Sequence, residues 1–198
     1  EKVEVVVTKP QVAKQQQEQQ QNDDHNIVIE KKNGNEKQKL KGWKVVEFGE
    51  IAKQISERVN PAPEDSSRYI GLEHLDSGSI RVSRWGTDVV LKGQKLLMKK
   101  GDILFAKRNA YLKRIALAPF DGIFSAHGMI LRPHGSLVIP EFLPFFMQSD
   151  LFMERAIAIS EGSLSPTIKW KTLARQQFSI PPRSKQEKMI NLLNRIQH

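Results

Sequence analysis

Residues 101–118 read GDILFAKRNAYLKRIALA and contain two short apolar runs, Ile103 to Ala106 and Ile115 to Ala118, on either side of a basic stretch. Short apolar runs bounded by turn residues are typical of buried strands rather than of helices. The two runs therefore predict a pair of neighbouring strands. Residues 107–114 would form the loop at the tip of the resulting hairpin.

More short strand candidates lie on both sides of this hairpin. They are Tyr69 to Leu72, Ile80 to Val82, Met129 to Leu131 and Phe178 to Ile180. Because turn residues rather than long helices separate them, they predict a twisted, mostly antiparallel sheet or partial barrel. The apolar spacing from Val45 to Ile55 instead predicts a short helix after an extended entry.

Helices are expected to flank the sheet, which makes the fold class α+β. Residues 141–159 predict two helical pieces that divide near Ser149. After Pro181 and Pro182, Ser184 and Glu187 have the spacing of a capping box, which predicts the start of another helix. Four apolar residues lie along one side of it: Met189, Ile190, Leu193 and Ile196. A helix this short is marginal alone, so we expect it to begin a longer helix or to pack on a partner.

Charge is distributed unevenly along the 198 residues. The chain has 31 Lys and Arg against 22 Asp and Glu, a formal net charge of +9. Residues 1–40 hold seven Lys and seven acidic residues, so the whole excess lies in residues 41–198. A basic domain favours a polyanionic partner, and no basic amphipathic helix points to a membrane surface. Nucleic acid is the favoured partner.

Composition excludes several classes of protein. No apolar run approaches the roughly 18 residues that a membrane span needs. The chain has no cysteine, which excludes disulfides, thiolate nucleophiles and cysteine-based zinc sites. We expect a soluble, cytoplasmic protein without membrane contact.

Three segments are predicted along the chain. Residues 1–41 form a Gln-rich leader that is too polar to bury a core and is expected to be disordered. Residues 42–182 form the folded domain, and residues 183–198 begin the last helix. The first residue is Glu1, which suggests a piece of a longer protein or a processed product; a half-size subunit that pairs with itself is the other account.

The hairpin tip is the main candidate for contact with DNA. It combines four cations with an amide and an aromatic ring and has no acidic residue: Lys107, Arg108, Asn109, Tyr111, Lys113 and Arg114. Cations neutralise phosphates, and the side chains of Arg and Asn have the geometry to read guanine and adenine edges. A solvated hairpin tip is the alternative, and Tyr111 would suit either DNA contact or packing beneath the loop.

A second and a third candidate lie upstream. In the segment around Arg84, that side chain could reach a base with help from Ser83, whereas Trp85 is expected in the core. Four lysines form another basic segment, suited to positioning on the DNA backbone or to an exposed solubilising face: Lys92, Lys95, Lys99 and Lys100.

The last candidate is the hydroxyl-rich segment of residues 162–171. Lys169 and Lys171 are predicted to bind phosphate there. Trp170 between them is expected to be buried.

Motifs for catalysis and metal binding are missing from the sequence. It has no glycine-rich phosphate loop, no paired His on a helix and no Gly-x-Ser-x-Gly turn, and its five His are scattered. Asp102 and Lys107 match only part of a metal-dependent nuclease pattern, and a turn at the start of a strand suits Asp102 better. The segment from Asn60 to Pro63 is a loop, not the tetrapeptide that holds a flipped adenine. We therefore expect a non-catalytic domain without metal or cofactor.

Taken in order, these segments resemble the target-recognition domain of type I restriction-modification DNA specificity (S) subunits, or the equivalent domain of a fused restriction-modification enzyme. The matching residues are Gly42-Trp43, Phe48-Gly49-Glu50-Ile51, Tyr69-Ile70-Gly71-Leu72-Glu73-His74-Leu75, Lys100-Gly101-Asp102-Ile103-Leu104-Phe105, Tyr111-Leu112-Lys113, Ala116-Leu117-Ala118-Pro119-Phe120-Asp121-Gly122, Leu131-Arg132-Pro133, Pro140-Glu141-Phe142-Leu143 and Pro181-Pro182. Each is short, and their order over about 150 residues carries the likeness. Asn109-Ala110 and Ala126-His127-Gly128 depart from the family pattern at loop positions, and so does Lys185.

The resemblance implies sequence-specific binding of double-stranded DNA, reading one part of a bipartite target. It also implies that partner methyltransferase (modification) subunits hold S-adenosylmethionine and methylate adenine, and that a restriction or helicase subunit can join them. The last helix would space two recognition domains or mediate self-association. A protein-interaction module that docks such subunits without reading DNA is the alternative, and a nuclease with a degenerate site around Asp102 is a third reading.

Overall fold

The computed structural model describes residues 27–28, 39–86 and 90–196. Most of the predicted leader, residues 1–41, lies outside the described residues. The described part of the leader contains β1 (Ile27–Val28), which pairs antiparallel with β2 (Lys39–Leu40). The chain divides into two units between Trp43 and Lys44. The elements described below belong to the second unit.

A four-stranded antiparallel sheet forms the centre of this unit, in the order β4-β11-β8-β9. Its strands are β4 (Ala52–Ile55), β8 (Ile103–Phe105), β9 (Ile115–Leu117) and β11 (Met129–Pro133). Ile103 lies opposite Leu117, and Phe105 lies opposite Ile115. The predicted hairpin is therefore confirmed, and its loop carries the basic stretch.

A second sheet has the order β5-β7-β10-β6 and contains one parallel pair, β6 with β10. Its strands are β5 (Arg58–Val59), β6 (Tyr69–Ile70), β7 (Lys95–Met98) and β10 (Gly122–Phe124). Strand β7 was not predicted, because Lys95 and the lysines on either side of the strand suggested an exposed surface. Leu96, Met98 and even Lys95 are buried, since the aliphatic stem of lysine packs well on apolar surface.

Two of the predicted secondary-structure elements were wrong. Residues 45–55 do not form a helix: they form β3 (Lys44–Glu47), a 3-10 turn at Phe48–Glu50 and β4. Here β3 pairs with β12 (Gln177–Ile180) and β4 with β11, so partners distant in sequence satisfy the backbone and override the local periodicity. Ile80 to Val82 is not a strand, because its link to the sheet is a single hydrogen bond from the amide of Leu117 to the carbonyl of Ile80.

Four helices complete the unit. They are α2 (Phe142–Gln148), α3 (Asp150–Ala158), α4 (Trp170–Ala174) and α5 (Arg183–Ile196). The predicted break at Ser149 is confirmed, and its Oγ accepts a hydrogen bond from the amide of Phe152 to cap α3. The predicted capping box at Ser184 is wrong, since α5 begins at Arg183 and the carbonyl of Pro182 accepts its first hydrogen bonds. No described helix has the length and apolar character needed to cross a bilayer.

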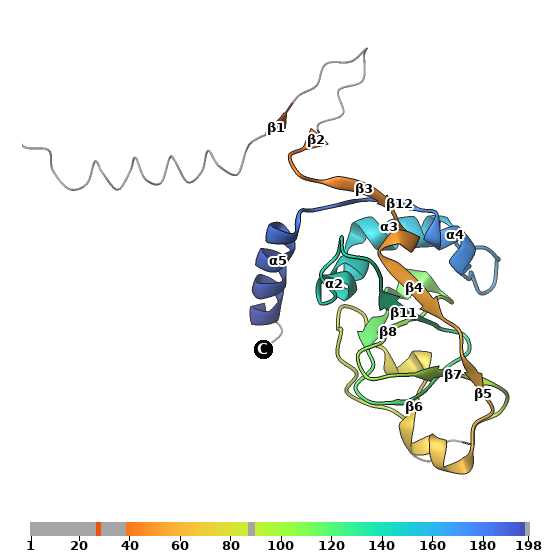
Figure 1. Ribbon diagram of the computed structural model, residues 1–198. Coiled ribbons are helices and arrows are strands. Elements are labelled where there is room, and N and C mark those ends of the chain that lie inside the picture. The colour runs from red at the N-terminus through yellow and green to blue at the C-terminus, as the bar shows by residue number, and fades with distance from the viewer. Residues whose placement is uncertain (1–26, 29–38, 87–89, 197–198) are drawn as a thin grey trace, which may run out of the picture. The chain divides into compact units, whose positions relative to one another are not determined.

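Aromatic rings fill the core between the helices and the central sheet. Phe152 on α3 is fully buried, and four other rings have their centroids 5.1–6.0 Å from its own: Phe48, Phe105, Phe146 and Phe178. Helices α2, α3 and α4 gather at one end of this unit, whereas β5, β6 and β7 lie at the other (Figure 1). The α+β fold with a mostly antiparallel sheet is confirmed, and the described strands form no closed barrel.

Candidate nucleic-acid interface

The loop between β8 and β9 has a defined backbone shape. The amide of Ala106 donates to the carbonyl of Arg114 at 3.1 Å and closes the stem of the loop. A 3-10 turn at Ala110–Leu112 follows Asn109 and precedes Lys113, and both of these residues have left-handed backbones, with φ of 54° and 49°. Asn tolerates this conformation better than most residues. The loop is therefore held in one bent form at the hairpin tip.

This loop is joined to the hydroxyl-rich segment before α4. The amide of Asn109 donates to the carbonyl of Pro166 at 2.9 Å, and the amide of Ile168 donates to the carbonyl of Lys107 at 3.0 Å. Ile168 is buried and anchors the segment in the core. The structure thus brings together the hairpin tip and residues 162–171, which the sequence analysis treated as separate candidates.

Lys107 and His127 each lie within electrostatic range of other basic side chains near the start of the loop, and we call these five residues the basic cluster: Arg58, Lys95, Lys107, Arg108 and His127. Burial and then the charge of Arg58 lower the pKa of Lys107. Burial and then the charges of Arg108, Lys107 and Lys95 lower the pKa of His127. Among the described residues, no member of the cluster forms an ion pair with a carboxylate. The result is a concentration of positive charge without a protein counterion.

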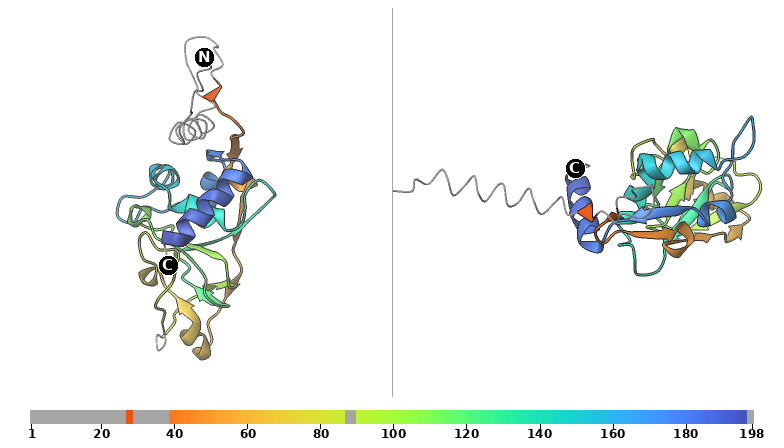
Figure 2. Two further views of the ribbon diagram at one scale, coloured as in Figure 1. Left: turned by 90° about the vertical axis from the view of Figure 1, so that its left-hand side faces the viewer. Right: turned by 90° about the horizontal axis from the view of Figure 1, so that it is seen from above.

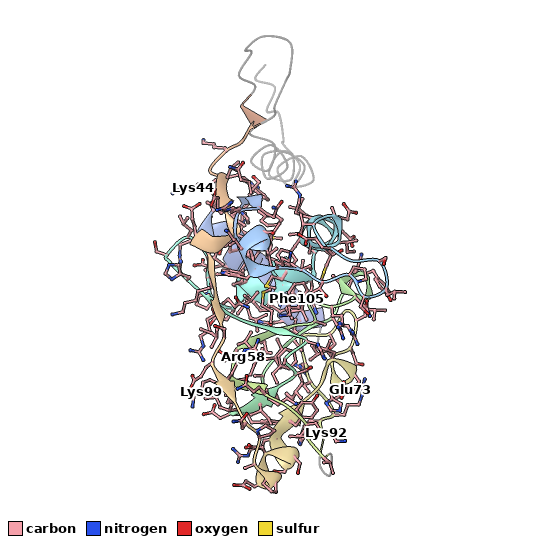
Figure 3. All side chains as sticks on the ribbon, turned by 90° about the vertical axis from the view of Figure 1, so that its right-hand side faces the viewer. Lys44, Arg58, Glu73, Lys92, Lys99 and Phe105 are labelled. Atoms are coloured by element: carbon pink, nitrogen blue, oxygen red, sulfur yellow. The ribbon has the colours of Figure 1, made fainter. Side chains whose placement is uncertain are left out.

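The cluster comes from four separate segments. Arg58 lies on β5 and Lys95 on β7, while Lys107 and Arg108 start the loop. Figure 3 labels Arg58 on the edge strand β5 and Phe105 in the interior of the unit. The ammonium of Lys95 donates to the carbonyls of Lys92 and Gly93, which leaves one of its three N–H donors for a ligand. Sequence reasoning did not select Arg58 or His127, because no local pattern links them to the loop.

Three other predicted site residues have acidic partners. Arg84 donates two hydrogen bonds of 2.8 Å to Asp76, and this pairing raises the pKa of Arg84. Lys113 pairs with Asp150 at 2.6 Å, and Lys169 pairs with Glu161 at the same distance. These pairs are exposed, so each contributes little stability and the cation can exchange its carboxylate for a phosphate. They are weaker candidates for phosphate contact than Lys107 and Arg108.

The remaining predicted residues differ in exposure. Tyr111 is 58% exposed, so it does not pack beneath the loop. Arg114 is half-buried, and its guanidinium donates to the carbonyl of Leu72 at 2.9 Å, which ties the loop to the turn after β6. Ser83 and Lys171 are exposed on the surface.

The two tryptophans of the candidate segments, Trp85 and Trp170, differ in burial. The prediction of a core position for Trp85 was wrong: it is 41% exposed and packs edge-on against Phe120, with ring centroids 5.2 Å apart. The loop that carries it lies at the margin of the second sheet, where one aromatic partner covers one side of the ring. Trp170 is partly buried, as predicted, and packs against Phe48 in the core.

Asp102 has a structural role. As predicted, it forms a turn before β8, where its carboxylate accepts a hydrogen bond from the amide of Lys99 at 2.8 Å. It also accepts two hydrogen bonds from Arg132, which sequence reasoning missed. No group of three or more His, Asp or Glu in the described part of the chain could hold a metal ion. Among the described residues, the carboxylate of Asp102 is held by Arg132 and by the amide of Lys99.

Residues 40–198 match the family model described as type I restriction modification DNA specificity domain. The chain belongs to this family. Specificity subunits are the non-catalytic components of type I restriction-modification systems, so family membership confirms the expected DNA specificity class without an enzyme activity of its own.

Two curated relatives are type I specificity subunits. The specificity domain is 25% identical over 165 residues to the type I restriction enzyme HindI specificity subunit of Haemophilus influenzae, covering 78% of this chain and 35% of that protein. It is 22% identical over 156 residues to the type I restriction enzyme EcoDI specificity subunit of Escherichia coli, covering 78% of this chain and 34% of that protein. The chain thus spans about a third of the length of these relatives.

Solved structures support the same fold. The HsdS subunit of Thermoanaerobacter tengcongensis aligns with a TM-score of 0.55 at 16% identity, over 95% of this chain and 46% of that one. The S subunit of a type I restriction-modification system from M. genitalium aligns with a TM-score of 0.54 at 16% identity, over 84% and 40% of the two chains. At this identity the likeness shows a shared fold and nothing further.

Proposed function

We propose that this domain binds double-stranded DNA in a sequence-specific manner as the target-recognition component of a restriction-modification system. It reads part of a bipartite target and directs adenine methylation or cleavage by partner subunits. The observation that carries the proposal is the basic cluster, in which Lys107 and Arg108 share one site with three further basic groups and have no acidic partner among the described residues.

The cluster supports a polyanionic ligand on electrostatic grounds. Burial, and then the repulsion between like charges, opposes the protonated forms of Lys107 and His127 and lowers the pKa of each. Phosphates that enter the site relieve the repulsion and release counterions from the DNA. The guanidinium of Arg108 would then read base edges; Oδ1 of Asn109 is buried without a hydrogen-bond partner among the described residues, so its amide would read a base only after the side chain turns outward.

Partner subunits belong to the same proposal. Methyltransferase subunits would hold S-adenosylmethionine and carry out the transfer, with a restriction or helicase subunit as a further partner. The last helix, α5, leaves Met189 43% and Leu192 60% exposed, which supports its use in docking a partner or in self-association. A DNA ligand agrees with the cytoplasmic location expected from the sequence.

Salt titration tests the proposal. The full chain is titrated with duplex DNA at several salt concentrations, and the logarithm of the association constant should fall linearly with the logarithm of salt. Arg108→Ala should make that slope shallower by about 0.9, the value for one lost phosphate contact. Lys188→Ala, which removes an exposed cation on α5, is the matched control and should leave the slope unchanged. Binding that does not respond to salt would contradict the DNA proposal and favour a protein-docking role.

A further inference from the structure

The loop between α3 and α4 carries an unusual side chain at its tip. Leu164 is 97% exposed, the highest exposure among the large apolar residues described. It follows Ser163 and precedes Ser165, and both of these serines are exposed as well. The loop projects past α4 in Figures 1 and 2. A leucine in this position contributes nothing to the core of the free domain.

Backbone hydrogen bonds hold the loop in a defined form. Glu161 and Thr167 bond to each other in both directions, at 3.1 and 2.8 Å, and close the loop across residues 162–166. The hydroxyl of Thr167 donates to the carbonyl of Ser165 at 3.1 Å, and Gly162 has a φ of 109° that side chains disfavour. Leu164 therefore lies in a loop that backbone hydrogen bonds close at its stem.

The position of the loop relative to the basic cluster is also fixed. The carbonyl of Pro166 accepts from the amide of Asn109, and Ile168 donates to the carbonyl of Lys107. Leu164 is thus two residues from a direct hydrogen bond to the hairpin tip. Glu161, the one acidic residue of the loop, is held by Lys169 at 2.6 Å. An anionic ligand at Lys107 and Arg108 would meet small residues, hydroxyls and one leucine at this loop, with no free carboxylate.

We propose that Leu164 enters a groove of the DNA held by Lys107 and Arg108 and makes an apolar contact with base pairs there. The proposal rests on the proposed DNA-binding function and adds a residue that helps select the target. Apolar side chains contact the methyl group of thymine in the major groove, or insert between base steps as a wedge. The flanking Ser163 and Ser165 would donate to backbone phosphates on either side.

The experiment uses the full chain and a duplex enriched from a random pool by binding to it. Leu164→Ser should weaken binding to the enriched duplex by roughly ten- to a hundredfold, as expected when burial of a leucine side chain is lost. The salt slope should stay unchanged, because no charge is removed. Leu164→Met should retain most of the affinity. Leu151→Ser, which removes another exposed leucine, on α3, is the matched control and should bind as the unmodified chain does.

Each outcome has a separate meaning. If Leu164→Ser binds as tightly as the unmodified chain and the salt response is intact, the inference is wrong and the DNA-binding function stands. If the unmodified chain fails to bind duplex DNA, both the inference about Leu164 and the proposed DNA-binding function are wrong. If the variant keeps its DNA affinity but loses assembly with a methyltransferase subunit, Leu164 is a protein contact. Replacement of thymine by uracil in the enriched duplex removes the methyl group and should weaken binding if Leu164 contacts it. A rise in 2-aminopurine fluorescence on binding would instead show that Leu164 wedges between base steps.

Discussion

Arg132 on β11 and Asp102 before β8 form a two-point ion pair. The guanidinium Nε donates to Oδ1 at 2.5 Å and Nη2 donates to Oδ2 at 3.0 Å. The side chain of Asp102 is 4% exposed, whereas that of Arg132 is 36% exposed, so one partner is buried and the other reaches solvent. The pair fastens the turn at Lys99 to the central sheet, because Asp102 also accepts from the amide of Lys99.

Asp102→Asn should therefore destabilise the domain. The amide cannot accept three hydrogen bonds in the same geometry, and Arg132 loses its counterion, so we expect a loss of about 2 kcal/mol in the free energy of unfolding. Urea unfolding measures it. Glu161→Gln, which removes an exposed ion pair with Lys169, is the control and should change stability by less than about 0.5 kcal/mol. Equal effects of the two substitutions would show that the buried pair has no special role.

Gln186 anchors α5 to the rest of the domain. Its side chain is fully buried; Oε1 accepts from the amide of Ile139 at 2.8 Å, and Nε2 donates to the carbonyls of Leu137 and Pro181 at 2.9 Å. Gln186→Leu removes the partners of one buried and two partly buried backbone groups and should cost about 3 kcal/mol. Hydrogen exchange should then show early opening of α5. Gln177→Leu on the exposed side of β12 is the control, and protection of α5 equal to that of the control would contradict this role.

His127 should make DNA binding depend on pH. Burial, followed by the charges of Arg108, Lys107 and Lys95, lowers its pKa from the usual 6.5, so a smaller fraction of it is protonated in the free domain than of an unperturbed histidine at the same pH. DNA phosphates offset those charges and raise the pKa of His127, so binding takes up a proton and tightens as the pH falls. We expect an affinity gain of about threefold between about pH 8 and about pH 6 that His127→Asn abolishes. A gain that persists in the variant would assign the effect to another group.

The same shift affects the stability of the free domain, with the opposite sign. The unfolded chain binds a proton at His127 more readily than the folded one, so this contribution to stability is complete above about pH 6.5 and is lost as the pH falls below it. Thermal unfolding of the free domain at several pH values, with His127→Asn as reference, measures the loss.

Asn109 separates loop shape from DNA contact. Its φ of 54° and ψ of 53° suit Gly as well as Asn, so Asn109→Gly should keep the stability within about 1 kcal/mol while removing the amide. Asn109→Val should cost about 1–2 kcal/mol, because a β-branched residue is strained there. Thermal unfolding gives the stabilities, and the ratio of affinities for an enriched and a random duplex gives the specificity. A Gly variant with unchanged specificity would show that the amide does not read DNA.

Local patterns were sufficient for the elements whose partners are close in sequence. The β8-β9 hairpin, the break at Ser149 and the turn at Asp102 follow from short apolar runs and turn residues, and all are present. The helix expected at residues 45–55 is not present, because this segment instead forms strands that pair with strands more than 70 residues away. The strand at Lys95–Met98 was not predicted, because Lys95 and the lysines on either side suggested an exposed surface.

The basic stretch at residues 107–114 and the net charge of +9 were readable from the sequence, because charge is a property of residue type. Which of those cations lack an acidic partner was decided by tertiary structure alone. Folding brings Asp76, Asp150 and Glu161 to Arg84, Lys113 and Lys169. It also brings Arg58, Lys95 and His127 to Lys107 and Arg108. Electrostatic energy depends on distance in space rather than on separation along the chain, so the basic cluster exists only in the folded domain.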